Sequence, residues 1–345
     1  MRPPGRLAGA DTPLLTALLG DPLRRRDAWR SWTRARGPLL DRVRADRTDR
    51  IRSLLPLAAG TAEIVELLDA ATLDAVRVAA AREQLRHETL ARITRSALAA
   101  FDQASIAVIA FDGFLLAEGY WPDPVARHSG GPRLVVPAES VDAALTTLAG
   151  AGWTPALIDP RFGPAPRPLR HASGVEAVVA ERPNDAAFDV AALEAMWSRS
   201  TGHGGGLVRR PAASDELFAL LVHGATYGTA RSMQWVLDAH FVASHRSLDW
   251  RAFTRTAGAH PTARRIAALL TSMADDLDTT VPGDVTAALS RSRCSESRRD
   301  FAALAAASRA TGRWNKVAMV RQAPSVAGAG LRATWILAER LTRAR

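Results

Sequence analysis

Apolar residues recur every three or four positions over most of the chain, a spacing that predicts a largely helical protein. Residues 11–20 and 23–36 are expected to form two helices, and Trp29 and Trp32 lie three apart as buried anchors of the second. A longer helix is predicted from Ala81 to Gln103. Its apolar stripe consists of Leu90, Ile93, Ala97 and Phe101.

Short apolar runs interrupt the helical period in the middle of the chain. Residues 106–110, 133–137 and 174–182 have strand character, and in the third run Val175, Ala177 and Val179 alternate with Glu176 and Val178. A helix is expected between the second and third runs, and residues after 207 return to a helical pattern. We therefore predict an α+β fold with three parts: an N-terminal helical region over 1–104, an α/β core over 105–200 and a C-terminal helical domain over 207–345.

Composition narrows the class of protein. The chain has 345 residues, of which 47% are hydrophobic and 23% charged, as is usual for a globular protein that can bury a sizeable core. No apolar run reaches the roughly 18 residues that a bilayer span requires, and the first residues lack the apolar segment of a secretory signal. We expect a cytoplasmic protein without membrane contact. Because Cys294 is the single cysteine, the chain cannot form an internal disulfide or a cysteine metal cluster.

The basic charge is weaker evidence for a nucleic-acid partner than its size indicates. The formal net charge is +10, yet Lys316 is the only lysine, an arginine bias that is typical of a GC-rich genome. The basic helix over 23–36, with its two tryptophans, keeps nucleic-acid binding open as a minor alternative. The glycines at 204–206 follow a histidine, as in the oxyanion loop of some esterases, but no Gly-x-Ser-x-Gly elbow follows, which argues against an esterase.

A family resemblance rests on two segments. The first has a strand, Gly113, a helix ending near Tyr120, then Arg127 and the strand Leu-Val-Val-Pro at 134–137. The second comprises His223, Gly224, Ala225, Tyr227, Gly228, Trp235, Asp238, Asp249 and Trp250. In this order the chain resembles, over about residues 25–260, the uncharacterised nucleotidyltransferase family of bacteria, within the polymerase-beta-like superfamily. The resemblance implies a small mixed sheet of nucleotidyltransferase type, flanked by N-terminal helices and a C-terminal helical region.

The resemblance also implies a site, from which this chain departs. Nucleotidyl transfer needs carboxylates that hold divalent metal on the triphosphate, and the family places two aspartates, one residue apart, at the start of the second strand. Here Gly131 and Arg133 occupy those positions, and Asp112 precedes Gly113 where the family has a lysine. Glu176 is the candidate for the remaining third carboxylate.

Two arrangements would keep a function at this site. In the first, a relocated catalytic site is formed by Asp112, Asp123 and Glu176. In the second, an anion is bound directly, in place of a metal, by Arg127 and Arg133. The candidate binding residues are completed by Gly113, Ser129, Gly131 and His223. For His223, packing between helices is favoured over a direct role.

We therefore expect a nucleotidyltransferase-like protein that lacks conventional metal-dependent transfer and acts as a binding or accessory protein. The resemblance links it to specialised biosynthesis of peptides or sugars, with a nucleotide or a peptide as the partner. The alternative is an active nucleotidyltransferase that uses a nucleoside triphosphate with Mg²⁺ at the relocated carboxylate and arginine site. Nucleic-acid binding through the N-terminal arginines is the third and weakest hypothesis.

Overall fold

The computed structural model describes residues 7, 9, 11–46, 50–111, 113–156, 167–183, 188–202, 206–229 and 232–292, and the account below concerns these residues. The spacing of Leu331, Trp335, Ala338 and Leu341 predicts an amphipathic helix over 331–345, which lies outside the described residues, as does Asp112. Within the described residues, no helix is both long enough and apolar enough to cross a membrane.

Short helices form the N-terminal part of the molecule. They are α1 (Thr12–Leu19), α2 (Pro22–Arg36), α3 (Leu39–Ala45), the 3₁₀ turn η1 (Arg52–Leu54), α4 (Leu55–Ala59) and α5 (Ala62–Val65). Trp29 and Trp32 are buried, which confirms their predicted role as anchors. Asp11 precedes α1 but its side chain makes no cap hydrogen bond; instead it accepts from Trp32 Nε1 at 3.0 Å and from Arg50 Nη1 at 2.6 Å.

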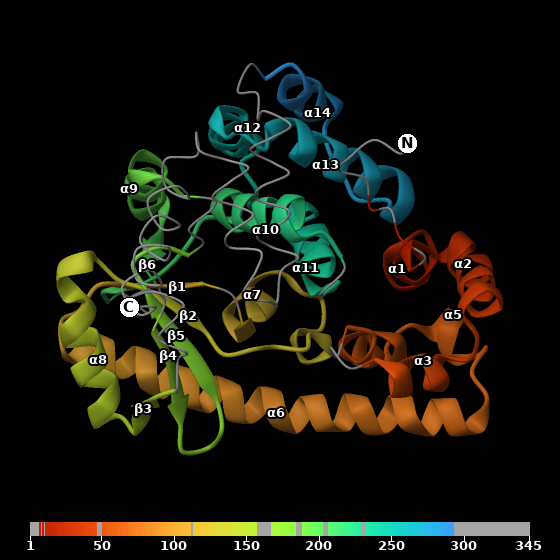
Figure 1. Ribbon diagram of the computed structural model, residues 1–345, viewed down its shortest axis with the longest axis horizontal. Helices are drawn as coiled ribbons and strands as arrows, with labels where there is room; N and C mark the ends of the chain where they lie inside the picture. Colours follow the sequence, from red (N-terminus) through yellow and green to blue (C-terminus); the bar gives the residue numbers. More distant parts are fainter. Residues whose placement is uncertain are drawn as a thin grey trace, which may run out of the picture.

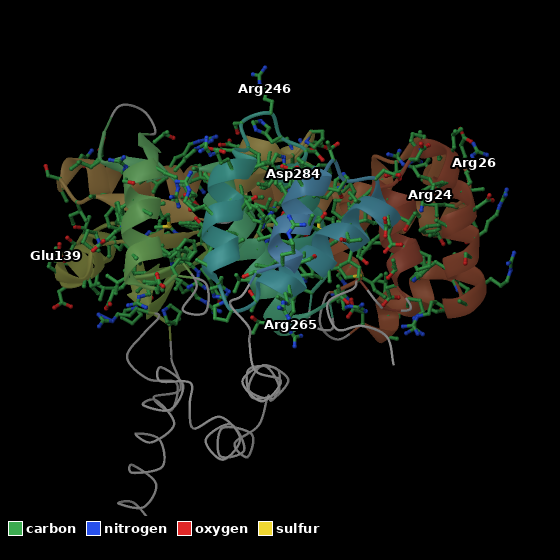
Figure 2. All side chains as sticks on the ribbon, turned by 90° about the horizontal axis from the view of Figure 1, so that it is seen from above. Arg24, Arg26, Glu139, Arg246, Arg265 and Asp284 are labelled. Carbon is green, nitrogen blue, oxygen red and sulfur yellow. The ribbon has the colours of Figure 1, made fainter. Side chains whose placement is uncertain are left out.

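The arginines of α2 engage carboxylates on neighbouring helices. Arg25 pairs with Glu63 at 3.1 Å, and Arg26 pairs with Glu66. Arg24 and Arg26 lie at one end of the molecule, and Glu139 lies at the other (Figure 2). Ion pairs along the charged side of α2 therefore hold this helix against the neighbouring parts of the same chain.

One long helix, α6 (Ala70–Gln103), connects this region to the sheet. It runs along the base of the molecule in Figure 1. Asp69 caps it by accepting from the Thr72 amide at 2.8 Å, so the helix begins eleven residues before the predicted start at Ala81. The predicted stripe is confirmed, because its four residues are buried against the sheet.

The sheet has seven strands in the order β3-β4-β5-β2-β1-β7-β6. The strands are β1 (Val108–Phe111), β2 (Arg133–Val135), β3 (Trp153–Pro155), β4 (Arg167–His171), β5 (Glu176–Ala180), β6 (Thr201–Gly202) and β7 (Val208–Arg210). β2 is antiparallel to β1 and parallel to β5, whereas β7 is parallel to β1. This mixed sheet among helices confirms the predicted α+β class.

Each face of the sheet belongs to a different core. Leu134, Ala177 and Val179 pack with the C-terminal half of α6 and with α8 (Val141–Gly150). On the other face, Ile109, Phe111 and Val135 join a larger core that continues into the helices on both sides. The predicted buried face of the third strand, with Ala177 and Val179, is thereby confirmed.

The remaining helices contribute to the larger core. They are α7 (Gly113–Tyr120), α9 (Val190–Arg199), α10 (Ala213–Tyr227), α11 (Gln234–Ala243), α12 (Trp250–Ala259), α13 (Ala263–Leu277) and α14 (Gly283–Ser290). The 3₁₀ turn η2 (Pro124–Ala126) precedes β2, and η3 (Ala138–Ser140) precedes α8. Asp249 caps α12, because its carboxylate accepts from the amides of Arg251 and Ala252 at 2.9 Å.

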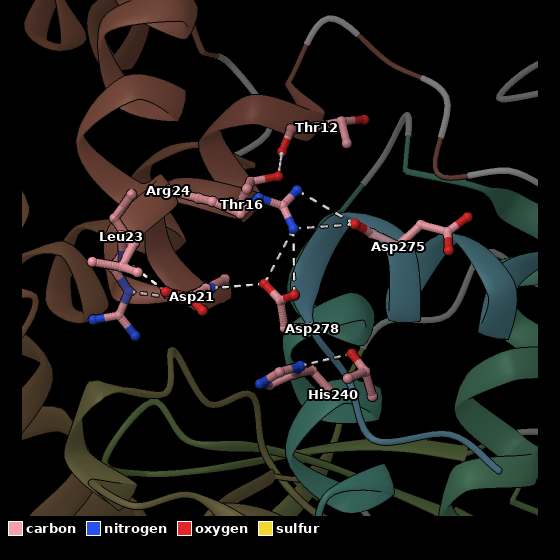
Figure 3. Close-up of polar contacts among 11 residues, drawn as sticks. Thr12, Thr16, Asp21, Leu23, Arg24, His240, Asp275 and Asp278 are labelled. Carbon is pink, nitrogen blue, oxygen red and sulfur yellow. Dashed lines mark hydrogen bonds and ion pairs between the residues drawn. The ribbon is translucent and has the colours of Figure 1, made fainter.

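The N-terminal helices meet α13 at a polar junction (Figure 3). The Asp21 amide donates to Asp278 Oδ2 at 2.8 Å, and Arg24 Nη1 donates to Asp278 Oδ1 at 3.3 Å. His240 shares a hydrogen bond of 2.8 Å with Thr279 beside this junction. One apolar core includes residues from both regions, among them Trp32 and Leu270. The domain boundaries near residues 104 and 207 stay a prediction.

Candidate functional site

The candidate site lies where β1 ends and α7 begins. Gly113, the first residue of α7, has φ +64°, a conformation that favours glycine. A Cβ atom at Gly113 would lie 3.1 Å from the carbonyl oxygen of Gly130. The amino-terminal end of α7 therefore faces the turn at Gly130 and Gly131 that leads into β2.

Gly131 is packed directly against the backbone of β5. A Cβ atom at this position would lie 1.3 Å from the carbonyl oxygen of Glu176, whereas one at Gly130 would meet no atom within 4 Å. The parallel pairing of β2 with β5 explains the approach, because the Val178 amide donates to the Pro132 carbonyl oxygen at 3.0 Å. With the backbone in this position, residue 131 has no room for any side chain.

Arg133 is the first residue of β2. It pairs with Phe111 of β1 and Val178 of β5, and its side chain is half-buried. The Arg133 side chain has no hydrogen-bond or ion-pair partner among the described residues. A guanidinium group, which carries a permanent charge, therefore stands at the edge of the turn, and the described residues supply no acceptor for its donors.

The two predicted carboxylates that the structure describes, Glu176 and Asp123, form no ion pair with this arginine. Glu176 is exposed on β5 and pairs across the strands with Arg170 at 2.6 Å. Asp123 is exposed and caps η2 by accepting from the Val125 amide at 3.1 Å. No group of three His, Cys, Asp or Glu side chains in the described part of the chain could hold a metal ion.

Arg127 anchors the loop between η2 and β2 through a buried ion pair. Its Nε and Nη2 atoms donate to the two carboxylate oxygens of Asp238 on α11, each at 2.8 Å. Both side chains are 3% exposed, and Trp121 Nε1 donates to the same carboxylate at 3.0 Å. This geometry is the bidentate pairing for which arginine is suited.

A second set of contacts fastens the loop to α6. Arg127 Nη1 donates to Ser129 Oγ at 3.0 Å, and the Ser129 amide donates to Glu83 Oε1 at 3.2 Å. His128 Nδ1 donates to Glu83 Oε2 at 2.8 Å. Burial raises the pKa of Glu83, but hydrogen bonds and charges from His128, Arg86 and the Ser129 amide outweigh it, so the pKa lies below its ordinary value.

The sequence matches a known protein family over a range that includes this loop and the helices that hold it. Residues 43–278 match the family described as uncharacterised nucleotidyltransferase. The chain belongs to this nucleotidyltransferase family. Searches among curated proteins and among solved structures gave no significant match.

The second segment that carries the family resemblance forms a contact between two helices. A Cβ atom at Gly224 on α10 would lie 2.5 Å from the ring of Trp235, so glycine allows α11 to approach α10 closely. Trp235 Nε1 donates to the Gly228 carbonyl oxygen at 3.0 Å. His223 lies half-buried on α10 beside this contact.

The sequence-based site omitted two residues that position the nucleotidyltransferase loop. Asp238 lies in the second segment that carries the family resemblance. Its contact with Arg127 could not be predicted from the sequence, because it depends on the packing of α11 beside the loop. Glu83 carried no signal in the sequence, since one glutamate in a charged helix is ordinary. Of the predicted binding residues, the structure brings Gly113 against the turn at Gly130 and Gly131, whereas Arg127 and Ser129 contact Asp238 and Glu83 instead.

Proposed function

We propose that this protein is a nucleotidyltransferase-family member that binds a nucleotide phosphate without conventional two-metal chemistry and acts as a binding or accessory protein. The observation that carries the proposal is the packing of Gly131 against β5. An aspartate at this position would place its Cβ 1.3 Å from the Glu176 carbonyl oxygen. The backbone is thus arranged for a residue without a side chain, at the place where the family chemistry calls for a metal-binding carboxylate.

The residues present do not suit a pair of magnesium ions. Magnesium is held by oxygen ligands, and carboxylates are needed to hold the cations that neutralise the negative charge developing on the phosphoryl oxygens. Glycine at 131 offers no side-chain ligand, and the guanidinium at 133 would repel a cation placed beside it. The motif is therefore best explained as a degenerate form of the family site.

The same residues suit an anion. The helix α7 begins at Gly113, and the first amides of a helix carry partial positive charge and lack partners within the helix. Arg133 adds a full positive charge on the neighbouring strand. A phosphate group that approaches the turn would meet backbone donors from one side and guanidinium donors from the other.

The rigid attachment of the turn supports a binding role. Arg127, Asp238 and Glu83 hold the loop to α11 and α6 through buried contacts, which is how a preorganised site keeps its geometry. We further propose that a peptide or sugar biosynthetic system uses this protein, with a nucleotide or a peptide as the partner. A nucleic-acid role is less well supported, because Arg25 and Arg26 of α2 are engaged by glutamates.

Calorimetric titration with ATP and GTP tests the proposal. Each nucleotide is titrated with magnesium, with manganese and with a chelator, using the wild type, Arg133→Gln and Arg246→Gln. Arg246 is an exposed control that points into solvent (Figure 2). We expect binding that persists in chelator, a roughly tenfold weaker affinity for Arg133→Gln and no change for Arg246→Gln.

A transfer assay completes the test. The protein is incubated with α-labelled ATP or GTP, magnesium or manganese, and a mixture of peptides and sugars, and labelled products are counted. We expect none above background. Tight binding that requires a divalent metal, or metal-dependent transfer of label, would overturn the proposal in favour of an active enzyme with a relocated site.

A further inference from the structure

One side of the long helix α6 is exposed along much of its length. Six exposed residues follow one another on it at alternating intervals of four and three positions, which is the spacing of one side of a helix: Asp74, Val78, Ala81, Leu85, Glu88 and Arg92. We call this line the outer face of α6. Residues on the opposite side of the helix, such as Val76 and Leu90, are buried. In Figure 1 the short N-terminal helices and α11 lie above α6, so the outer face points away from them.

The middle of the outer face is apolar. Leu85 is 66% exposed and Val78 is 49% exposed, and Ala81 between them is exposed as well. Val78 and Leu85 are seven positions apart, which is the repeat by which two helices pack along a shared seam. Exposed apolar side chains in one line, bordered by charged residues, are typical of an interaction surface.

Charged residues border this apolar centre on both sides. Asp74 and Arg77 precede it, and Glu88 and Arg92 follow it. All four are exposed, and none of them has an ion-pair partner within the described part of the chain. Glu88 accepts one hydrogen bond, from Gln84 of the same helix at 3.5 Å. The order along the helix is therefore acid, base, apolar centre, acid, base.

This order is complementary to itself when it is read in the opposite direction. We propose that the outer face of α6 binds the outer face of a second copy of this chain, with the two helices antiparallel. In the register that we propose, Ala81 of each copy lies opposite Leu85 of the other, so that each large side chain meets a small one. The two-fold axis of such a dimer passes between these two positions.

The charges select this arrangement. In the antiparallel register, Asp74 faces Arg92 of the partner subunit, and Arg77 lies next to Glu88 of the partner subunit. Each of these contacts occurs twice because of the two-fold symmetry. A parallel pair in register would instead place every charged residue beside its own copy, and like charges in contact oppose association.

Sedimentation velocity of the full chain over a series of concentrations tests the inference. The proposed contact is a single helix pair, small beside the roughly 1,600 Å² of a standard interface, so we expect a reversible shift from monomer to dimer as the concentration rises. Leu85→Asp is expected to weaken self-association tenfold or more, because it places a charge in the apolar centre. Leu23→Asp, at a leucine of α2 that is 89% exposed, is the matched control and should associate like the wild type.

Exchange of charges tests the antiparallel register. Arg77→Glu and Glu88→Arg each bring like charges together in a homodimer, and each is expected to weaken self-association roughly tenfold. An equimolar mixture of the two variants pairs opposite charges again, so it is expected to form heterodimers about as tight as the wild-type dimer. The two positions are about three turns apart on one helix, so a contact within a single chain does not explain this rescue.

Three results would overturn the inference: the wild type stays monomeric at every concentration, Leu85→Asp associates like the wild type, or the mixture of charge variants associates no more tightly than either variant alone. A monomeric wild type would leave the outer face to a different protein. Far-ultraviolet circular dichroism and the melting temperature check that each variant folds. None of these measurements uses a nucleotide, so their outcome is independent of the proposed function.

Discussion

The loop that joins α7 to β2 contains two halves of different construction. The first half, from Trp121 to Ser129, is held by side chains, with the Arg127–Asp238 pair buried and Glu83 receiving two hydrogen bonds from the loop. The second half, from Gly130 to Arg133, is held by backbone contacts with β5. One half depends on buried charges, and the other depends on the absence of a side chain.

This contrast separates the framework of the site from its chemistry. The side chains of the first half set where the loop lies, and they are placed as a rigid site would require. The second half carries Gly131, which has no space for a side chain, and Arg133, whose side chain has no partner in the described part of the chain. The proposed function rests on this second half, because the first half would hold the loop in place whichever ligand the turn binds.

The largest effect is expected from breaking the first half. Arg127→Ala would leave the Asp238 carboxylate buried without its cation, at a cost of about 3–5 kcal/mol in the free energy of unfolding. Urea denaturation measures it. Arg44→Ala, which breaks the exposed pair with Asp41, is the control and should cost less than about 1 kcal/mol.

A double variant sharpens the interpretation. Arg127→Met with Asp238→Leu removes both charges together and is expected to recover part of the loss, because no buried ion remains unpaired. If Arg127→Ala alone costs no more than the Arg44 control, the buried pair does not hold the loop.

The next largest effect concerns the second half. Gly131→Ala would force the added methyl into the backbone of β5, and we expect a loss of about 1–3 kcal/mol. Gly130→Ala is the matched control, since its Cβ meets no atom within 4 Å; its stability should stay the same or rise by less than about 1 kcal/mol. Equal melting temperatures for the two variants would contradict the close packing of Gly131 against β5.

A smaller effect is expected from the pH dependence of the first half. Because the folded-state pKa of Glu83 lies below its ordinary value of 4.5, its contribution to stability is present above pH 4.5 and is lost as the pH falls below that value. Glu83→Gln should therefore flatten the fall in unfolding free energy below pH 4.5. Glu88→Gln, an exposed change on the same helix, is the reference. Identical slopes for the two variants would show that Glu83 has no such role.

The smallest effect on stability is expected at Arg133. Arg133→Gln removes a charge that has no partner among the described residues, so the unfolding free energy should change by less than about 0.5 kcal/mol. The same variant is expected to bind nucleotide more weakly. A large loss of stability would indicate that Arg133 is a structural residue, unlike the rest of the proposed phosphate site.

Several elements of the fold were predictable, and those that were missed share a cause. The helical stripe of α6 and the alternation of β5 are long or regular enough to be read from spacing. The strands β4, β6 and β7 have two to five residues and are rich in Arg, Pro or Gly. Their sequences therefore contain no apolar alternation from which a strand could be predicted. They exist because neighbouring strands supply their hydrogen bonds.

The candidate site divides in the same way. The order of the chain identified the turn at Gly113, the position of Arg127 and the unusual residues at 131 and 133. It did not indicate that Asp238, more than a hundred residues later, completes the Arg127 contact, nor that Glu83 fastens Ser129. Each of these contacts joins segments that only the packing of helices brings together.

The sequence by itself determined the residue types at the critical positions, the helical periodicity, and the family to which the resemblance pointed. Only the tertiary structure decided whether residue 131 has room for a carboxylate, because the answer depends on how close β5 lies to the turn. It also decided which charges are buried and paired, because the free energy of a charge depends on the solvent and partners that folding places around it.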